Sequence, residues 1–98
     1  MAKITTQSTN DTFFDGVTFK ATVNQLIQAF GEPTVFDNTG EDKTNFEWDM
    51  ETESGDVFCI YDWKQYKVLE MDKVYEWHIG ARSKSIAQTA KQEILKSF

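Results

Sequence analysis

The sequence predicts an α+β fold: a single antiparallel β-sheet of about four to five strands with two α-helices packed mainly on one face. Three observations lead to this prediction. Strand-like segments fill the middle of the chain, two segments with helix-start signals flank them, and the links between neighbouring strands are short. Short links favour antiparallel pairing, and the apolar face of such a sheet has only the two helices to cover it.

Residues 1–12 are polar and lack a sustained period, which predicts a flexible N-terminal arm ahead of one domain over residues 13–98. Ile4 is the one anchor in this arm for a short edge strand. In residues 13–19, Asp-Gly is flanked by β-favouring side chains, a pattern typical of a hairpin turn.

A helix is predicted to begin at Thr22, because Thr22 and Gln25 have the spacing of a capping box. Gly31 and Pro33 provide its stop signal. The apolar residues between these signals are spaced to share one helical face: Val23, Leu26, Ile27 and Phe30.

The middle of the chain reads as strands and turns. Residues 34–36 favour a short strand, and residues 37–42 form an acidic turn by composition. Residues 44–52 alternate between apolar and acidic side chains, as in a strand with one face in solvent. After a turn at 53–56, the apolar run 57–63 is typical of a central strand covered on both faces, and the two strands should form a hairpin.

No conformation is predicted for the polar connection 64–73. The strand at 74–79 places Tyr75, Trp77 and Ile79 on one face and Glu76 and His78 on the other. The last helix is predicted to begin at a capping box on Ser85, with Ser83 as a competing cap, and to run to about Ser97.

Composition and charge exclude several classes of function. A net charge of -6 argues against nonspecific binding to nucleic acid or to anionic membranes, and a basic protein is a better match. No apolar run approaches the ~20 residues that cross a bilayer, and no signal-peptide core is evident. Cys59 is the single cysteine, so an intramolecular disulfide is impossible. We therefore expect a cytoplasmic protein in a reducing compartment, with Cys59 buried.

One candidate site lies where the last strand passes into the last helix. The start of a helix exposes free backbone amides, and here Arg82, Ser83 and Lys84 add two cations and a hydroxyl group. This combination suits a phosphate or a carboxylate. An ordinary solvated helix cap explains the same residues.

Aromatic side chains on neighbouring strands suggest a second part of the same site. Trp63 and Trp77 offer flat faces on which a nucleobase can stack, although core packing explains them equally well. If the strand ends coincide, aromatics and cations meet at one end of the sheet. The predicted ligand-binding residues are Trp63, Lys64, Trp77, His78, Arg82, Ser83 and Lys84.

Metal, cofactor and catalytic signals are weak. One histidine and one cysteine cannot make a usual zinc site, and the acidic loop 37–42 lacks the spacing of an EF-hand. There is no phosphate-binding glycine-rich motif, so no cofactor and no catalytic residue is predicted. A general base at His78, oriented by Asp62 or Glu47, remains a third possibility.

Three short words of sequence carry a resemblance: Phe-Glu-Trp at 46–48, Tyr-Asp-Trp-Lys at 61–64 and Trp-His-Ile-Gly at 77–80, followed by a basic helix start. In this order they resemble small uncharacterised bacteriophage proteins of about this length, over roughly residues 17–95. Some small phage proteins act against bacterial immunity by sequestering nucleotide signals or by blocking a defence protein. The resemblance implies a binding role without turnover.

The leading hypothesis is a non-catalytic, phage-type binding protein that captures a small phosphate-bearing, nucleotide-like ligand and so blocks host immune signalling. A homo-oligomer is expected, because a second chain can close the pocket. The alternative is an acidic inhibitor that binds a host defence protein, motivated by the excess of acids between residues 32 and 56. A further alternative is a small hydrolase that uses His78.

Overall fold

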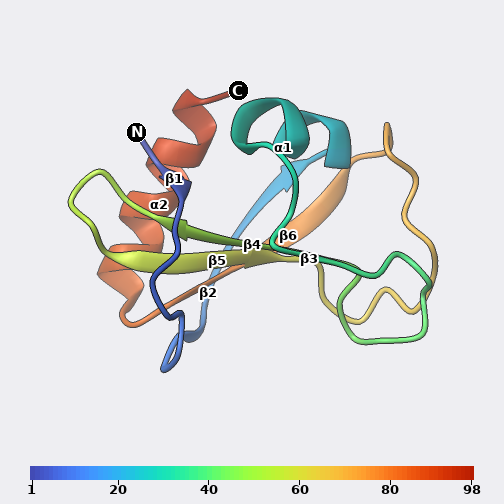
Figure 1. Cartoon of the computed structure of the whole chain (residues 1–98), viewed down its shortest axis with the longest axis horizontal. Coiled ribbons are helices and arrows are strands. Elements are labelled where there is room, and N and C mark those ends of the chain that lie inside the picture. Colours follow the sequence, from blue (N-terminus) through green and yellow to red (C-terminus); the bar gives the residue numbers. More distant parts are fainter.

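The computed structural model describes residues 1–98 as one antiparallel six-stranded sheet with two helices (Figure 1). In chain order, the elements are β1 (Lys3–Ile4), β2 (Phe13–Ala21), α1 (Val23–Phe30), β3 (Val35–Phe36), β4 (Phe46–Glu51), β5 (Val57–Tyr61), β6 (Tyr75–Ala81) and α2 (Lys84–Lys96). The strand order is β1-β4-β5-β6-β2, and β3 also pairs with β4. The predicted α+β class is confirmed, with one strand more than expected.

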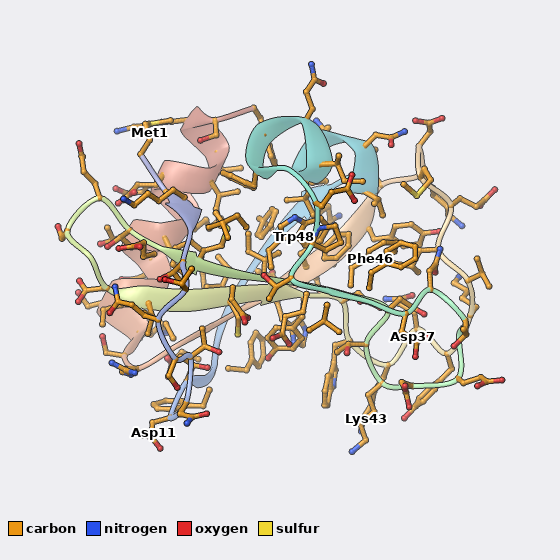
Figure 2. All side chains as sticks on the ribbon, in the orientation of Figure 1. Met1, Asp11, Asp37, Lys43, Phe46 and Trp48 are labelled. Carbon is orange, nitrogen blue, oxygen red and sulfur yellow. The ribbon has the colours of Figure 1, made fainter.

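Successive side chains of a strand point to opposite faces of the sheet, so every second side chain faces the helices. Phe46, Trp48 and Met50 of β4 are fully buried, whereas Glu47 and Asp49 between them point to the other face. Figure 2 shows Phe46 and Trp48 on the side of α1, and Lys43 on the opposite side. The core lies between the sheet and the two helices, and the opposite face has no helix over it.

Local signals set both helix starts. At α1 the capping box forms as predicted: the Thr22 side chain accepts from the Gln25 backbone N–H, and the Gln25 side chain accepts from the Thr22 N–H. At α2 the cap is Ser83, whose hydroxyl accepts from the Ile86 N–H at 3.2 Å. The competing cap is therefore the one used, and the prediction of Ser85 is wrong.

The Asp15-Gly16 pair does not make the predicted hairpin turn. Residues on both sides of it pair with the same neighbour, because Phe14 lies opposite Gly80 and Thr18 lies opposite His78 in β6. The pair forms a bulge inside one long strand, and Gly16 has the positive φ of 85° that a bulge often requires.

The N-terminal arm, residues 1–12, contributes a short strand to the edge of the sheet, at the position where Ile4 was expected to anchor one. β1 pairs with the edge of β4, and the Thr5 N–H donates to the Asp49 carbonyl at 3.0 Å. The arm then crosses one end of the uncovered face, where Thr12 Oγ1 lies 3.8 Å from Cys59 Sγ. Most of its side chains are polar, but Ala2 is buried in the core and β1 is hydrogen-bonded to β4.

The N-terminal arm, which crosses the uncovered face, determines which residues of β5 are buried. Cys59 points to the uncovered face yet is buried, as predicted, because residues near Thr12 cover it. Tyr61, two residues further along, lies beyond the arm and is only half-buried, so β5 is not covered on both faces along its whole length. Neither helix has the length and apolar character needed to span a bilayer.

Candidate functional site

The uncovered end of the sheet carries four aromatic side chains, which we call the aromatic platform: Phe14, Tyr61, Trp63 and His78. The His78 ring stacks on Phe14 with 4.0 Å between ring centroids. The Trp63 ring lies 6.3 Å from His78 and is inclined to it by only 26°. Tyr61 stands edge-on to both, at 5.5 Å from His78 and 6.0 Å from Trp63.

Strand register explains why these rings meet. Tyr61 of β5 lies directly opposite His78 of β6, so both side chains project from the same face. Phe14 comes from β2, which pairs with the other edge of β6. It lies opposite Gly80, two residues along β6 from His78, so its side chain projects from the same face as that of His78. The platform therefore draws on three strands that are distant in sequence.

A buried carboxylate fixes the chain on either side of Trp63. Asp62 accepts hydrogen bonds from the Asn45 N–H at 2.8 Å, the Asn45 side-chain amide at 3.0 Å and the Phe46 N–H at 2.9 Å. Directly after Trp63, the Lys64 N–H donates to the Lys43 carbonyl at 2.7 Å. These bonds join the loop before β4 to the segment after β5, which holds Trp63 at the end of the sheet.

Two cations accompany the exposed indole. The ammonium groups of Lys64 and Lys43 lie 5.3 and 5.9 Å from the centroid of the Trp63 ring, within the range of a cation–π interaction. Neither lysine forms an ion pair, because both ion pairs of the chain belong to the N-terminal amine. The side chain of Trp63 is 39% exposed. An anion bearing a flat ring would find both kinds of contact here.

Two carboxyl groups border the platform on the β4 side. Glu47 lies opposite Tyr61 and Asp49 lies opposite Cys59. Burial raises the pKa of Glu47 to about 7, and hydrogen bonding to Asp49 and the negative charge of Asp49 act in the same direction. Oδ1 of Asp49 is buried and accepts no hydrogen bond. Glu47 is therefore partly protonated near pH 7.

Three other groups on this face also have shifted pKa values. Burial lowers the pKa of His78, although the negative charge of Glu76 opposes this, so His78 is mainly neutral at pH 7. Burial also raises the pKa of Cys59 to about 11 and that of Tyr61 to about 12. The thiol and the phenol therefore stay protonated, and Cys59 is a poor nucleophile.

The carboxylates expected to orient His78 do not do so. Asp62 is fully buried and binds Asn45 and Phe46 instead. Glu47 is separated from His78 by Tyr61, which occupies the intervening strand. No hydrogen bond reaches the His78 ring, whose contacts are to the other aromatic rings.

The other predicted residues lie elsewhere. Trp77 is fully buried on the helical side, packs edge-on to Trp48 at 5.7 Å and donates from Nε1 to the Ala21 carbonyl at 2.9 Å. Arg82 lies at the opposite end of β6 from Trp63, since Tyr61 is opposite His78 whereas Phe58 is opposite Ala81. The predicted meeting of two indoles with these cations is therefore wrong.

Each residue at that far end has a structural role or no partner. The Arg82 guanidinium donates to the carbonyls of Ser8 and Asn10 at 3.3 Å, which fastens the N-terminal arm. Ser83 caps α2, and Lys84 is its exposed first residue. Of the predicted set, the structure brings together Trp63, Lys64 and His78.

Four members of the site lie outside the predicted ligand-binding set: Phe14, Lys43, Glu47 and Tyr61. Lys43 belongs to the acidic segment 32–56 as its single cation, which was a usable signal. Phe14 was assigned to a hairpin that does not form. Glu47 was considered as a partner that orients His78 and as part of a solvated acidic face, whereas its position beside Tyr61 depends on the register of β4 and β5.

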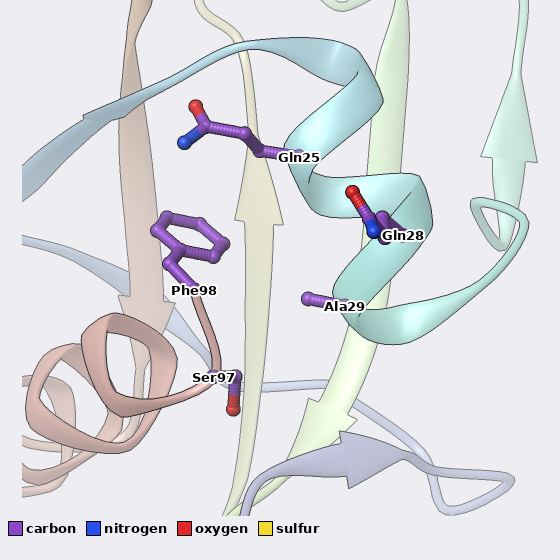
Figure 3. A pocket seen from close by; sticks show the side chains of 5 residues that line it. All are labelled: Gln25, Gln28, Ala29, Ser97 and Phe98. Carbon is purple, nitrogen blue, oxygen red and sulfur yellow. The ribbon is translucent and has the colours of Figure 1, made fainter.

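A pocket of about 420 Å³ lies on the other side of the molecule, between α1 and the end of α2 (Figure 3). It is lined by Gln25, Gln28, Ala29, Ser97 and Phe98. The Phe98 ring packs towards Phe19 and Phe30 at 6.2 and 6.4 Å. No charged side chain lines this pocket, so it does not suit a phosphate, and no predicted site residue borders it.

Comparison with protein-family models, with curated proteins and with solved structures finds no match to this chain. The candidate site therefore stands on its geometry: an exposed indole, a neutral imidazole and two unpaired ammonium groups at one end of an uncovered sheet face.

Proposed function

We propose that this protein binds a small phosphate-bearing, nucleotide-like ligand on the aromatic platform and does not turn it over. The observation that carries the proposal is the exposed Trp63 indole, inclined by 26° to His78 and flanked by the ammonium groups of Lys43 and Lys64. Stacking on an aromatic side chain contributes roughly 1–3 kcal/mol per base. Charge-assisted hydrogen bonds from the two lysines would hold the phosphate.

The net charge favours a small ligand over a polymer. At -6, the chain repels an extended nucleic acid, whereas one phosphate needs only the local field of the two lysines. In the setting that the resemblance to small bacteriophage proteins implies, the protein would act in the host cytosol and withdraw a nucleotide signal from host immunity. A second copy of the chain would cover the solvent side of the bound ligand.

Calorimetry against linear and cyclic nucleotides tests the proposal. Trp63→Ala should weaken binding by about tenfold or more, because it removes the stacking surface. Lys64→Gln should weaken binding and reduce its dependence on salt. Lys84→Gln is the matched control: it removes the same charge at the far end of the sheet and should leave affinity unchanged.

Two results would overturn the proposal. One is the absence of binding by every nucleotide in the panel. The other is binding that Trp63→Ala and Lys84→Gln change to the same extent. Light scattering with and without the bound nucleotide measures whether a second copy takes part.

Exposed apolar side chains at the β3 edge favour a second candidate, an acidic inhibitor of a host defence protein. Phe36 is 64% exposed and Val35 is 48% exposed, and the exposed acids Glu41 and Asp42 follow in the next loop. Apolar and acidic groups together suit a basic protein surface. Phe36→Ser should abolish specific capture from host extract in a pulldown, and an unchanged pulldown would rule out this surface.

A further inference from the structure

The aromatic platform has chemically unlike borders on two sides. Beyond Trp63 it meets the ammonium groups of Lys43 and Lys64, whereas across β4 from Tyr61 it meets the carboxyl group of Glu47. A planar ligand that places its phosphate at the lysines and extends over Tyr61 would turn another edge of its ring towards Glu47. The chemistry of that carboxyl group then decides which ring fits.

The carboxyl groups of Glu47 and Asp49 have oxygen atoms that accept no hydrogen bond from the chain. Apart from the hydrogen bond that it shares with Asp49, the half-buried Glu47 carboxyl group has no partner in the chain, because no backbone N–H, amide or cation donates to it. Its neighbour Asp49 also has a buried oxygen without a donor. Half-buried carboxylates usually accept hydrogen bonds, because burial without a donor is unfavourable. A ligand edge that carries N–H groups would satisfy this acceptor.

We infer that the platform selects a guanine-type ring, whose adjacent ring N–H and exocyclic amine both donate to the Glu47 carboxylate. This inference rests on the proposed function and adds the identity of the base to it. Two neighbouring N–H groups match the two oxygens of one carboxylate. Adenine presents one donor beside one acceptor, and that acceptor repels an ionised carboxylate.

The test measures the affinities of guanosine, inosine and adenosine 5′-monophosphates by calorimetry at a pH above 7, where Glu47 is mainly ionised. Inosine keeps the ring N–H but lacks the exocyclic amine, so it isolates one hydrogen bond. The guanine nucleotide should bind about tenfold more tightly than the inosine nucleotide, and more tightly still than the adenine nucleotide. Glu47→Gln should remove most of the preference for guanine.

Glu51→Gln is the matched control, because it removes one charge from the same face of β4, two strand positions beyond Asp49 and further from Tyr61. It should leave the order of affinities unchanged. Equal binding of the three nucleotides, or a preference for adenine, would overturn the inference while leaving the proposed function intact. A guanine preference that survives Glu47→Gln would also overturn it. Failure of all three nucleotides to bind would instead count against the proposed function itself.

Discussion

Trp77 and His78 are neighbours in β6, yet they lie on opposite faces of the sheet in unlike surroundings. Trp77 is fully buried, and its one polar atom donates to the Ala21 carbonyl. His78 is partly exposed, and no hydrogen bond reaches its ring. The covered face has satisfied its polar groups within the chain, whereas the uncovered face keeps rings, cations and acceptors without partners. Groups left in this state are available to a ligand.

The same contrast separates the three tryptophans. Trp48 donates to the carbonyl of Gly31 at the end of α1 at 3.0 Å, and Trp77 donates to the carbonyl of Ala21 at the end of β2, so both indoles are hydrogen-bonded within the chain. The Trp63 indole makes no such bond and contacts two lysines and two other rings. Substitutions on the two faces should therefore have different consequences.

The largest expected effect is that of Trp77→Ala. Removal of a fully buried indole leaves a cavity and an unpaired Ala21 carbonyl, which should lower the free energy of unfolding by about 3–5 kcal/mol. Trp63→Ala, at an exposed position, should cost less than about 1 kcal/mol. Urea denaturation followed by circular dichroism measures both. Similar losses for the two variants would mean that the two faces do not differ as described.

Asp62→Ala should have the next largest effect, because it leaves three donors from Asn45 and Phe46 without an acceptor. We expect a loss of about 3 kcal/mol, since each unsatisfied buried donor costs about 1–3 kcal/mol and water can reach part of the opened site. The change should also release Trp63, which near-ultraviolet circular dichroism would detect below the unfolding transition. A stable variant with an unchanged Trp63 signal would contradict the role assigned to Asp62.

Gly80→Ala probes the packing under the N-terminal arm. A Cβ atom at this position would lie 2.8 Å from Cys59 Sγ, closer than such atoms approach. The clash should cost about 1–3 kcal/mol. Cys59→Ala in the same chain removes the sulfur, so a double-mutant cycle should show recovery of most of that loss. If the stability losses of the two variants simply add, the strain does not come from the contact between the new Cβ atom and Cys59 Sγ.

The smallest expected effect is the pH dependence that Glu47 contributes. Its pKa is about 7 in the folded chain and 4.5 at its ordinary value, so between these values the folded state binds more protons than the unfolded state. Stability should fall as the pH rises from about 4.5 to about 7, by an amount on the order of 1 kcal/mol after solvent screening. Thermal unfolding of Glu47→Gln should lack this decline. A decline of the same size in the variant would assign it to another group.

Local patterns predicted most of the fold. The capping box at Thr22 and the alternation in residues 46–51 depend on residues close in sequence, and both appear as expected; the apolar run of β5 forms its strand, although the Tyr61 end is covered on one face only. The Asp15-Gly16 pair did not behave as predicted, because a turn and a bulge share the same residues and differ only in the strand that pairs beyond them.

The site was predictable in part. Alternation already placed Trp77 and His78 on opposite faces, so the grouping of both with Trp63 conflicted with a pattern present in the sequence. Whether Arg82 or Lys43 joins Trp63 depends on the register of β5 and β6 and on the bond from Lys64 to Lys43. Contacts of this kind join residues far apart in the chain, and no local pattern specifies them.

The side-chain N–H signals of the three tryptophans offer the most direct test of the uncovered face as a binding surface. A titration with guanosine 5′-monophosphate, followed by ¹⁵N-edited NMR, reports on each indole separately. Our account predicts that the Trp63 signal moves with added nucleotide while those of Trp48 and Trp77, which are hydrogen-bonded in the core, stay in place. Movement of the two core signals with Trp63 unchanged, or saturable binding that leaves Trp63 unaffected, would contradict it.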